Sequence, residues 1–442
     1  MPSSSAIVVG GGLAGIACAL DLAASGVRVS LLESRRRLGG RATSFTDAAT
    51  GETLDNCQHV ALGCCTEFLG LCERLGVLGL MEWSDTQWWI EAGGRTSMLR
   101  PGVLPVPAHY AGSFAAATFL TVNEKVAIAS ALLRIVMREA QDDAGRTLGE
   151  VLRELEQPPG AIAKFWSPVI VSACNLGVDR VAATLAEKVF RDGFSGSREA
   201  GMIALPRVPL VRLYDPAIEA IESLGGSVVF GARAEHVDAR GVTLSDGSRL
   251  EASAVVSALP IERAAEAIKG ASERADFAAM LREGVSPILG VHLELDRPLM
   301  DQPHAVLVDR PTQWLFRKSP DGSRVHAVVS AADDWMALDE REIVARIMAD
   351  VAACLPGGSA ARVVRARPVK ERRATFAATP AFEAARPVPG SCVDGVFLAG
   401  DYTSTGWPAT MEGAVRSGIA AAAAVVTQLE PMGQGRRFAA RS

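Results

Sequence analysis

The chain of 442 residues is long enough for two or three domains, and 49% of its residues are hydrophobic, which provides ample apolar surface for a core. Its net charge of −5 argues against nucleic acid as a partner. No apolar run is long enough to span a bilayer, and the first residues lack the basic start and cleavage site of a signal peptide. Eight cysteines without metal-binding spacing predict free thiols in a reducing compartment, and therefore a cytoplasmic protein without a bound metal.

The first predicted unit is a strand, a glycine turn and a helix over residues 6–26, followed by a second strand that ends at Glu33. Three glycines of this unit have the spacing G-x-G-x-x-G. Gly10 permits a tight turn, Gly12 lets the backbone approach a pyrophosphate, and Gly15 lets the helix pack closely on the strand. Glu33 ends the second strand, at the position where a carboxylate accepts hydrogen bonds from the ribose hydroxyls of a dinucleotide. The unit therefore predicts a dinucleotide-binding domain.

Two further segments favour FAD over NAD as the dinucleotide. The Gly-Gly-Arg turn at residues 39–41 can bring the backbone and the guanidinium of Arg41 beside a diphosphate, whereas the arginines at 35–37 are interpreted as a solvated loop. GVFLAGD, at residues 395–401, predicts a strand whose last residue, Asp401, can meet the ribityl chain and the phosphates.

Between these segments the chain is predicted to alternate between two domains. Hairpin turns are expected at Gly93-Gly94 and at Asp246-Gly247, and a helix-rich stretch follows the first of them. The predicted segments are 1–85, 214–285 and 390–430 for the FAD-binding domain, 86–213 and 286–389 for a second domain of mixed sheet and helices, and 431–442 for a flexible tail.

A last motif, TGWPATMEGAVRSG at residues 405–418, predicts a helix that begins at the flavin. Pro408 suits the first turn of a helix, and the free N–H groups at residues 409–412 are expected to point at the N1–C2=O edge of the flavin. Gly413 and Gly418 are expected to keep the helix thin against the cofactor. A helix N-terminus lowers the pKa of a carboxyl group, which argues against Glu412 as a proton donor.

These segments carry a family resemblance. The opening, VVGGGLAGIACALDLAASGVRVSLLESRRRLGGRATSF, resembles the FAD-binding start of the amine oxidase and carotenoid desaturase superfamily. More narrowly, LDNCQHVALGCC, CNLGVDRVAA, LPRVPL, ERRATFAATPA and AGDYTSTGWPATMEGAVRSG resemble the hydroxysqualene dehydroxylase family, also described as squalene-associated flavin-dependent desaturases. The chain departs from the family at Cys57, where glycine is expected, and at Tyr402, where tryptophan is frequent. The resemblance implies an α/β fold, in which a Rossmann-like FAD-binding domain of the glutathione reductase or amine oxidase type is interleaved with a substrate domain.

The resemblance also implies an activity, the reduction of hydroxysqualene to squalene by reduced FAD with loss of water, in the route toward hopanoids or C30 carotenoids. The sequence shows no second dinucleotide-binding unit, so the electron donor stays unknown. Two alternatives remain open at this point. The first is a phytoene-type desaturase or amine oxidase-like flavoenzyme, and the second is a non-enzymatic prenyl-binding carrier, because such carriers share this fold.

Removal of an allylic hydroxyl group needs a proton donor for the leaving oxygen. His59 in DNCQHV is the first candidate, because an imidazole titrates near neutral pH. Asp55 is expected either to orient or charge His59 or to hold backbone groups at the turn. Gln58 is expected either to contribute to the same chemistry or simply to hydrogen-bond the flavin. Arg372 and Arg373 in ERRATF either line the site or form a solvated strand face. Cofactor contacts are predicted at Gly10, Gly12, Leu13, Ala14, Gly15, Glu33, Ser34, Gly39, Gly40, Arg41, Ala234, Gly400, Asp401, Pro408, Ala409, Thr410 and Met411.

A C30 hydrocarbon concentrates in bilayers, so we also predict that the protein docks on the inner face of a membrane without spanning it. Residues 109–136 offer a candidate surface, in which Tyr110, Phe114, Phe119 and Leu120 precede an amphipathic helix. The alternative is that these side chains form the core of the second domain.

Overall fold

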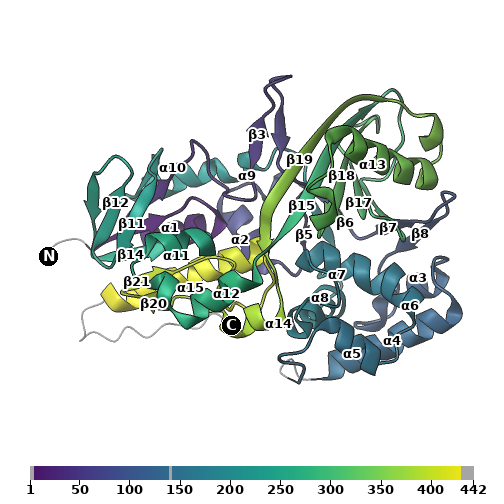
Figure 1. Cartoon of the computed structure of the whole chain (residues 1–442), viewed down its shortest axis with the longest axis horizontal. Coiled ribbons are helices and arrows are strands. Elements are labelled where there is room, and N and C mark those ends of the chain that lie inside the picture. The colour runs from purple at the N-terminus through teal and green to yellow at the C-terminus, as the bar shows by residue number, and fades with distance from the viewer. Residues whose placement is uncertain (1–3, 139–141, 430–442) are drawn as a thin grey trace.

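The computed structural model describes residues 4–138 and 142–429. Figure 1 shows a sheet covered by helices on the left, a second sheet at the upper right, and a layer of helices below the second sheet. The α/β architecture follows the prediction. None of the described helices combines the length and the apolarity needed to cross a membrane.

The first sheet is mainly parallel and contains β1 (Ser5–Val9) at its centre, with the order β10-β2-β1-β14-β21-β20. Residues 6–9 are apolar and buried, as expected for a central strand that is covered on both faces. Only the pair β20 and β21 is antiparallel among the described strands of this sheet. The other strands are β2 (Arg28–Glu33), β10 (Ser227–Phe230), β14 (Ala254–Ser257), β20 (Cys392–Val393) and β21 (Val396–Leu398).

Two helices from opposite ends of the chain pack side by side on this sheet, α1 (Leu13–Ala24) and α15 (Met411–Leu429), as Figure 1 shows. A Cβ atom at Gly418 would clash with the carbonyl oxygen of Ala14 in α1. The expectation that Gly418 thins the helix against the cofactor was therefore wrong. Its missing side chain lets α15 approach α1.

The second sheet is built around the long antiparallel pair β15 (Val285–Leu295) and β19 (Val363–Phe376), in the order β19-β15-β18-β17-β16-β7-β8. Helix α13 (Glu340–Cys354) covers one face, where its Ile343, Ile347 and Val351 pack with apolar residues of β15. The remaining strands are β7 (Gln87–Ile90), β8 (Thr96–Leu99), β16 (His304–Leu307), β17 (Trp314–Arg317) and β18 (Arg324–Ser330).

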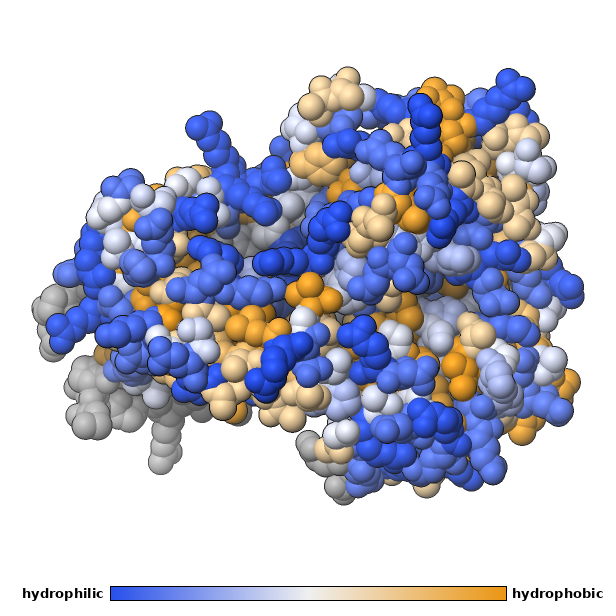
Figure 2. Space-filling view, viewed as in Figure 1, coloured by the Kyte–Doolittle hydropathy of each residue, from blue (hydrophilic) through white to orange (hydrophobic). Residues whose placement is uncertain are grey.

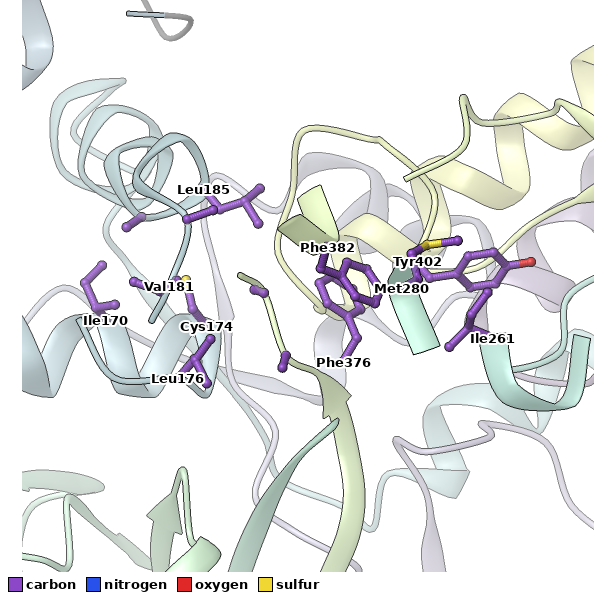
Figure 3. Packing of buried hydrophobic residues seen from close by; sticks show 14 of the residues in the cluster. Ile170, Cys174, Leu176, Val181, Leu185, Ile261, Met280, Phe376, Phe382 and Tyr402 are labelled. Atoms are coloured by element: carbon purple, nitrogen blue, oxygen red, sulfur yellow. The ribbon is translucent and has the colours of Figure 1, made fainter. Parts of the chain in front are cut away.

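The helical layer packs around buried aromatic residues that include Trp166 and Phe190, whose ring centroids lie 4.8 Å apart. The same core continues toward the first sheet, and Figure 3 shows Phe376 against Phe382, with Tyr402 and Met280 nearby. The helices of the layer are α3 (Ala111–Ala116), α4 (Val122–Met137), α5 (Leu148–Glu154), α6 (Pro159–Ala161), α7 (Ser167–Cys174) and α8 (Ala183–Ser195).

The remaining elements connect these layers. They are β3 (Ser44–Thr46), β4 (Thr53–Asp55), β5 (Ala61–Leu62), β6 (Met81–Ser84), β9 (Ile203–Pro206), β11 (Ala234–Asp238), β12 (Gly241–Leu244), β13 (Arg249–Glu251), α2 (Thr66–Arg74), α9 (Val211–Tyr214), α10 (Pro216–Ser223), α11 (Ile261–Ala267), α12 (Ala275–Glu283) and α14 (Pro380–Ala385). The two predicted hairpin turns join β7 to β8 and β12 to β13. The domain boundaries drawn from the sequence stay a prediction, and the predicted tail lies outside the described residues.

Of the segment 109–136 expected to dock on a membrane, the four side chains named before the helix lie in the core, which was the alternative left open by the sequence. Phe119 and Leu120 are buried, and the ring of Phe119 stacks on Trp89 with centroids 4.9 Å apart. Tyr110 and Phe114 are half-buried and contact the rings of Phe194 and Phe165 respectively. These aromatic side chains belong to the core of the helical layer, because a ring removed from water gains more there than on the surface.

The face drawn in Figure 2 is mainly hydrophilic, and its hydrophobic residues form small groups.

Candidate active site

A cavity of about 1040 Å³ lies where the two sheets and the helical layer meet. Ligand pockets commonly have roughly 300–1,000 Å³, so this cavity has room for a large ligand or for a cofactor with a substrate. Residues from both ends of the chain line it, which agrees with the prediction that both ends contact one ligand. The predicted site residues at its wall are Gly10, Gly12, Leu13, Ala14, Glu33, Ser34, Gly39, Gly40, Arg41, Gln58, His59, Ala234, Gly400, Asp401, Pro408, Ala409, Thr410 and Met411.

The glycine turn before α1 forms one wall of the cavity. Gly10 has a φ of 111°, and a Cβ atom there would lie 2.8 Å from the carbonyl oxygen of Ala258, so a larger residue does not fit. The Gly39-Gly40 turn lies against it, since the N–H of Gly39 donates to the carbonyl of Gly11 at 2.9 Å. No side chain caps the N-terminus of α1, whose first N–H groups remain for an anion. This bare backbone fits the diphosphate of a dinucleotide.

Gly15 does not line the cavity. A Cβ atom there would clash with the carbonyl oxygen of Gly10, so its role is the close packing of α1 on the turn.

Glu33 lies at the cavity wall at the end of β2, as predicted, and is buried. One carboxylate oxygen accepts a hydrogen bond from the N–H of Gly11 at 2.8 Å, and the other accepts from the N–H of Arg35 at 2.7 Å. The carboxylate therefore joins the glycine turn to the next loop, a function that the sequence pattern did not reveal. Its remaining lone pairs can accept from ribose hydroxyls.

Arg41 and Asp401, each predicted to contact the cofactor, form an ion pair with an Nη2–Oδ1 distance of 2.5 Å. The Asp401 side chain is buried and the Arg41 side chain is partly exposed. The pair joins the loop after β2 to the residues that follow β21, and both segments lie beside the cavity. Arg41 retains further N–H donors that can face a phosphate. Arg35 and Arg37, interpreted from the sequence as part of a solvated loop, also line the cavity, so that interpretation was wrong for these two residues.

The turn before α15 and the first residue of the helix form the next part of the wall, through Pro408, Ala409, Thr410 and Met411. Pro408 lies three residues before the helix, so the expectation that it stands in the first helical turn was wrong. The following residue, Glu412, is fully buried, and burial raises its pKa despite hydrogen bonds from Phe68, Glu67 and Arg416. The expectation of a lowered pKa was wrong, because loss of water outweighs the helix terminus.

Glu412 nevertheless has its oxygens occupied. They accept from the N–H groups of Phe68 at 2.8 Å and Glu67 at 3.2 Å, and from Nε of Arg416 at 2.6 Å. The residue before α2, Cys65, provides no capping side chain. Glu412 therefore caps α2 from a distance, which makes it a structural group.

His59 lines the cavity, and its Nδ1 lies 3.1 Å from the carbonyl oxygen of Cys57. Burial lowers the pKa of His59, although the Cys57 carbonyl and the carboxylates of Asp55 and Glu371 act in the opposite direction. The ring is therefore neutral at neutral pH. Because Nδ1 carries the proton toward Cys57, Nε2 is the nitrogen that remains for a ligand.

Asp55 does not line the cavity, and the expectation that it orients His59 is not supported. Its Oδ1 accepts from Oγ of Ser44 at 2.8 Å and from the N–H of Leu210 at 2.9 Å. Asp55 thus joins the β3–β4 hairpin to the start of α9. The sequence signal, a carboxylate four positions before a histidine, did not distinguish a structural from a catalytic carboxylate.

Gln58 lines the cavity next to His59, but both ends of its amide have protein partners. Its Nε2 donates to the carbonyl of His59 at 3.1 Å, and its Oε1 accepts from Nζ of Lys318 at 3.0 Å. Gln58 therefore fixes the backbone that carries His59.

The ERRATF segment contributes a different residue from those predicted. Glu371 lines the cavity, whereas Arg372 and Arg373 are exposed, and Arg372 donates to the carbonyl of Met336 at 3.2 Å. Arg372 and Arg373 therefore belong to a solvated strand face, the second of the two possibilities that the sequence left open.

Beyond these polar residues, the wall of the cavity becomes apolar and aromatic. Helices α7 and α8 supply one side and the second sheet supplies the other, where the rings of Trp314 and Phe316 stack with centroids 5.5 Å apart. No local motif marks these residues, which come together only through the fold. They are Val169, Ala173, Val189, Phe194, Ile203, Ile288, Val306, Trp314, Phe316 and Val328.

A family model described as flavin containing amine oxidoreductase matches residues 13–426. The chain belongs to this family. It is therefore an FAD-dependent oxidoreductase, as predicted, and the glycine turns and helix termini of the cavity suit FAD. A non-enzymatic carrier is set aside.

The similar proteins of known sequence include phytoene desaturases and a hydroxysqualene dehydroxylase. The chain is 26% identical to 15-cis-phytoene desaturase of Synechococcus elongatus over 98% of both chains, and 28% identical to hydroxysqualene dehydroxylase of Sinorhizobium fredii over 94% of this chain and 96% of that protein.

Among solved structures, a putrescine oxidase double mutant superposes with a TM-score of 0.72 at 16% identity. The superposition covers 96% of this chain and 100% of the putrescine oxidase chain. Cyclohexylamine oxidase of Brevibacterium oxydans has a TM-score of 0.67 at 18% identity, with 97% of this chain and 100% of its own covered. These likenesses confirm the predicted fold class.

The position of Glu33 predicts its effect on the cofactor. Glu33→Arg places a cation against the ribose and releases the glycine turn, so the purified protein is expected to lack the visible absorbance of bound flavin. The exposed neighbour Arg36 gives a matched control, because Arg36→Glu leaves the wall intact and should keep the protein yellow. Full flavin absorbance in a folded Glu33→Arg protein, judged by circular dichroism, would refute the assignment.

The contacts of Glu412 predict a loss of stability. Glu412→Gln removes one acceptor from the buried N–H groups of α2 and the charge opposite Arg416, which is expected to cost about 1–3 kcal/mol of unfolding free energy. Chemical denaturation measures this difference. The exposed Glu340→Gln serves as control and should change stability by less than about 0.5 kcal/mol. Equal stability of the two variants would contradict the capping role.

Proposed function

We propose that the protein reduces hydroxysqualene to squalene, using FAD as its redox cofactor. The observation that carries the proposal is the continuous cavity, in which the polar wall that suits FAD leads into an apolar wall of aliphatic and aromatic side chains. A polyisoprenoid has no polar group along most of its length, so it gains free energy from such a wall, roughly 0.8 kcal/mol for each buried CH2 group. The relative from Sinorhizobium fredii supports the choice of substrate.

The reaction requires a proton for the leaving oxygen and a hydride for the allylic carbon that becomes electron-poor. Reduced FAD, when bound, supplies the hydride. The chain itself has to bind the alkyl chain, exclude water from the reacting carbon and deliver the proton.

We assign proton delivery to His59. The carbonyl of Cys57 fixes the ring through Nδ1, and Gln58 fixes the backbone that carries it. Nε2 must first take up a proton, which it then donates to the hydroxyl group of the substrate. Glu371, at the same wall, favours the protonated ring, because its carboxylate raises the pKa of His59 against burial.

A desaturase that removes hydrogen from a polyisoprenoid is the second candidate. The phytoene desaturase relatives favour it, and an apolar cavity suits a carotenoid precursor equally well. The cavity suits an amine substrate less well, because its apolar wall offers few groups that can bind a cation. The carboxylate of Asp192 lies at this wall, but it already pairs with Nζ of Lys188 at 2.6 Å.

Product analysis separates the two candidates. Purified holoprotein incubated anaerobically with hydroxysqualene and chemically reduced FAD is expected to yield squalene, whereas phytoene with oxidised FAD should remain unchanged. The heat-denatured protein controls for chemical reduction. Desaturated phytoene without squalene formation would reverse the assignment.

The lowered pKa of His59 predicts a pH profile. If the cationic ring gives the proton, single-turnover reoxidation of reduced flavin by hydroxysqualene is expected to accelerate as the pH falls below 6.5, the usual pKa of the residue. His59→Ala should remove this dependence and lower the rate by roughly 10²–10⁴-fold, with flavin still bound. Gln58→Ala, which leaves the imidazole in place, should keep the shape of the profile. An unchanged rate in His59→Ala would exclude the residue.

A further inference from the structure

Helix α4 exposes an apolar stripe that no part of the described chain covers. Val122, Val126, Leu133 and Met137 are exposed to 74%, 64%, 57% and 77%, and Ala129 between them is also exposed. Their positions i, i+4, i+7, i+11 and i+15 place them along one face of the helix. Single exposed apolar residues are common, but a line of them over a whole helix marks an interaction surface.

The opposite face of α4 is also apolar and packs in the core through Ile128, Ala131 and Ile135. A capping box of Thr121 and Glu124 fixes the start of the helix. The exposed stripe is therefore held in a defined orientation. Figure 1 shows α4 at the outer edge of the helical layer, together with α3, α5 and α6.

The charges of α4 indicate what covers the stripe. Its one acidic residue, Glu124, is buried, where it accepts from the N–H of Thr121 at 2.7 Å and faces Lys164 at 3.6 Å. The other charged residues of the helix are basic, the half-buried Lys125 and the exposed Arg134. A surface of apolar and basic side chains complements a bilayer with anionic headgroups. A second copy would instead bring its own basic residues against these.

We propose that α4 docks the protein on an anionic lipid surface through Val122, Val126, Ala129, Leu133 and Met137. These side chains reach no deeper than the boundary between the headgroups and the acyl chains. The choice of lipid as the occupant rests on the proposed function, because a polyisoprenoid substrate resides in the bilayer. The carbonyl of Ile135 in α4 accepts from Nε of Arg191 in α8 at 2.9 Å, and Val189 and Phe194 of α8 line the apolar wall of the cavity. Docking through α4 thus brings the substrate-binding half of the molecule close to the membrane.

Sedimentation of the FAD-loaded protein with vesicles tests the proposal. Wild type is expected to pellet with vesicles of phosphatidylcholine and phosphatidylglycerol, and less with phosphatidylcholine alone. The double variant Val126→Glu with Leu133→Glu should bind about tenfold or more weakly, because two charges replace apolar groups at the interface. Val388→Glu, at a position 70% exposed outside the helical layer, is the matched control and should pellet like wild type.

A charge variant separates the two contributions. Arg134→Glu should weaken binding to the anionic vesicles and leave binding to phosphatidylcholine unchanged, and added salt should reduce the difference. Wild type that stays in the supernatant with both vesicles would overturn the proposal. So would equal pelleting of wild type and the double variant.

Two measurements distinguish docking on lipid from dimer formation and from failure of the proposed reaction. Light scattering after size exclusion measures whether wild type is a dimer and the double variant a monomer. If so, and if wild type does not bind vesicles, the stripe is the interface with a second copy of the chain. Turnover of detergent-dissolved hydroxysqualene should be the same in wild type and the double variant, because the stripe lies outside the cavity. If neither converts the substrate but wild type still pellets, the proposed reaction fails while the docking surface stands.

Discussion

The contact between α1 and α15 is the constraint on which the site depends. These helices stand near opposite ends of the chain, and glycine at 418 lets them approach until the backbone of α15 meets the carbonyl of Ala14. The two helices start at the same cavity, and residues of both first turns line its wall. A hydrogen bond after β21 also fixes α15, since the N–H of Gly400 donates to Oγ of Ser417 at 2.5 Å. One cofactor can then contact segments almost the whole length of the chain apart.

The buried carboxylates around the cavity share a second constraint, the need to bind backbone N–H groups or a cation. Glu33 binds the glycine turn, Asp55 binds the start of α9, and Glu412 caps α2. A buried carboxylate without such partners is costly, and a loop without them is mobile. The carboxylates therefore determine the shape of the cavity, whether or not they also touch a ligand.

The amine oxidases that share this fold at 16–18% identity show that the fold leaves the substrate open. In this chain, the part of the cavity wall beyond the glycine turns is apolar. The same helical layer that supplies part of the wall carries the exposed stripe of α4 on its outer side. In the two proposals, substrate binding and membrane docking depend on this one layer, and the residues predicted to contact the cofactor lie mainly around the first sheet.

The sequence by itself determined the features that depend on local backbone geometry. The G-x-G-x-x-G spacing, the acidic end of β2 and the hairpin glycines each act within a few residues, and the structure has a turn, strand end or hairpin at these positions. The tertiary structure decided how side chains far apart in the chain pair. Arg41 meets Asp401, Asp55 binds Ser44 and the start of α9, Glu371 lies at the cavity while its arginine neighbours are exposed, and Phe119 stacks in the core. The physical reason is that backbone geometry is set by neighbours in sequence, whereas burial and pairing are set by neighbours in space.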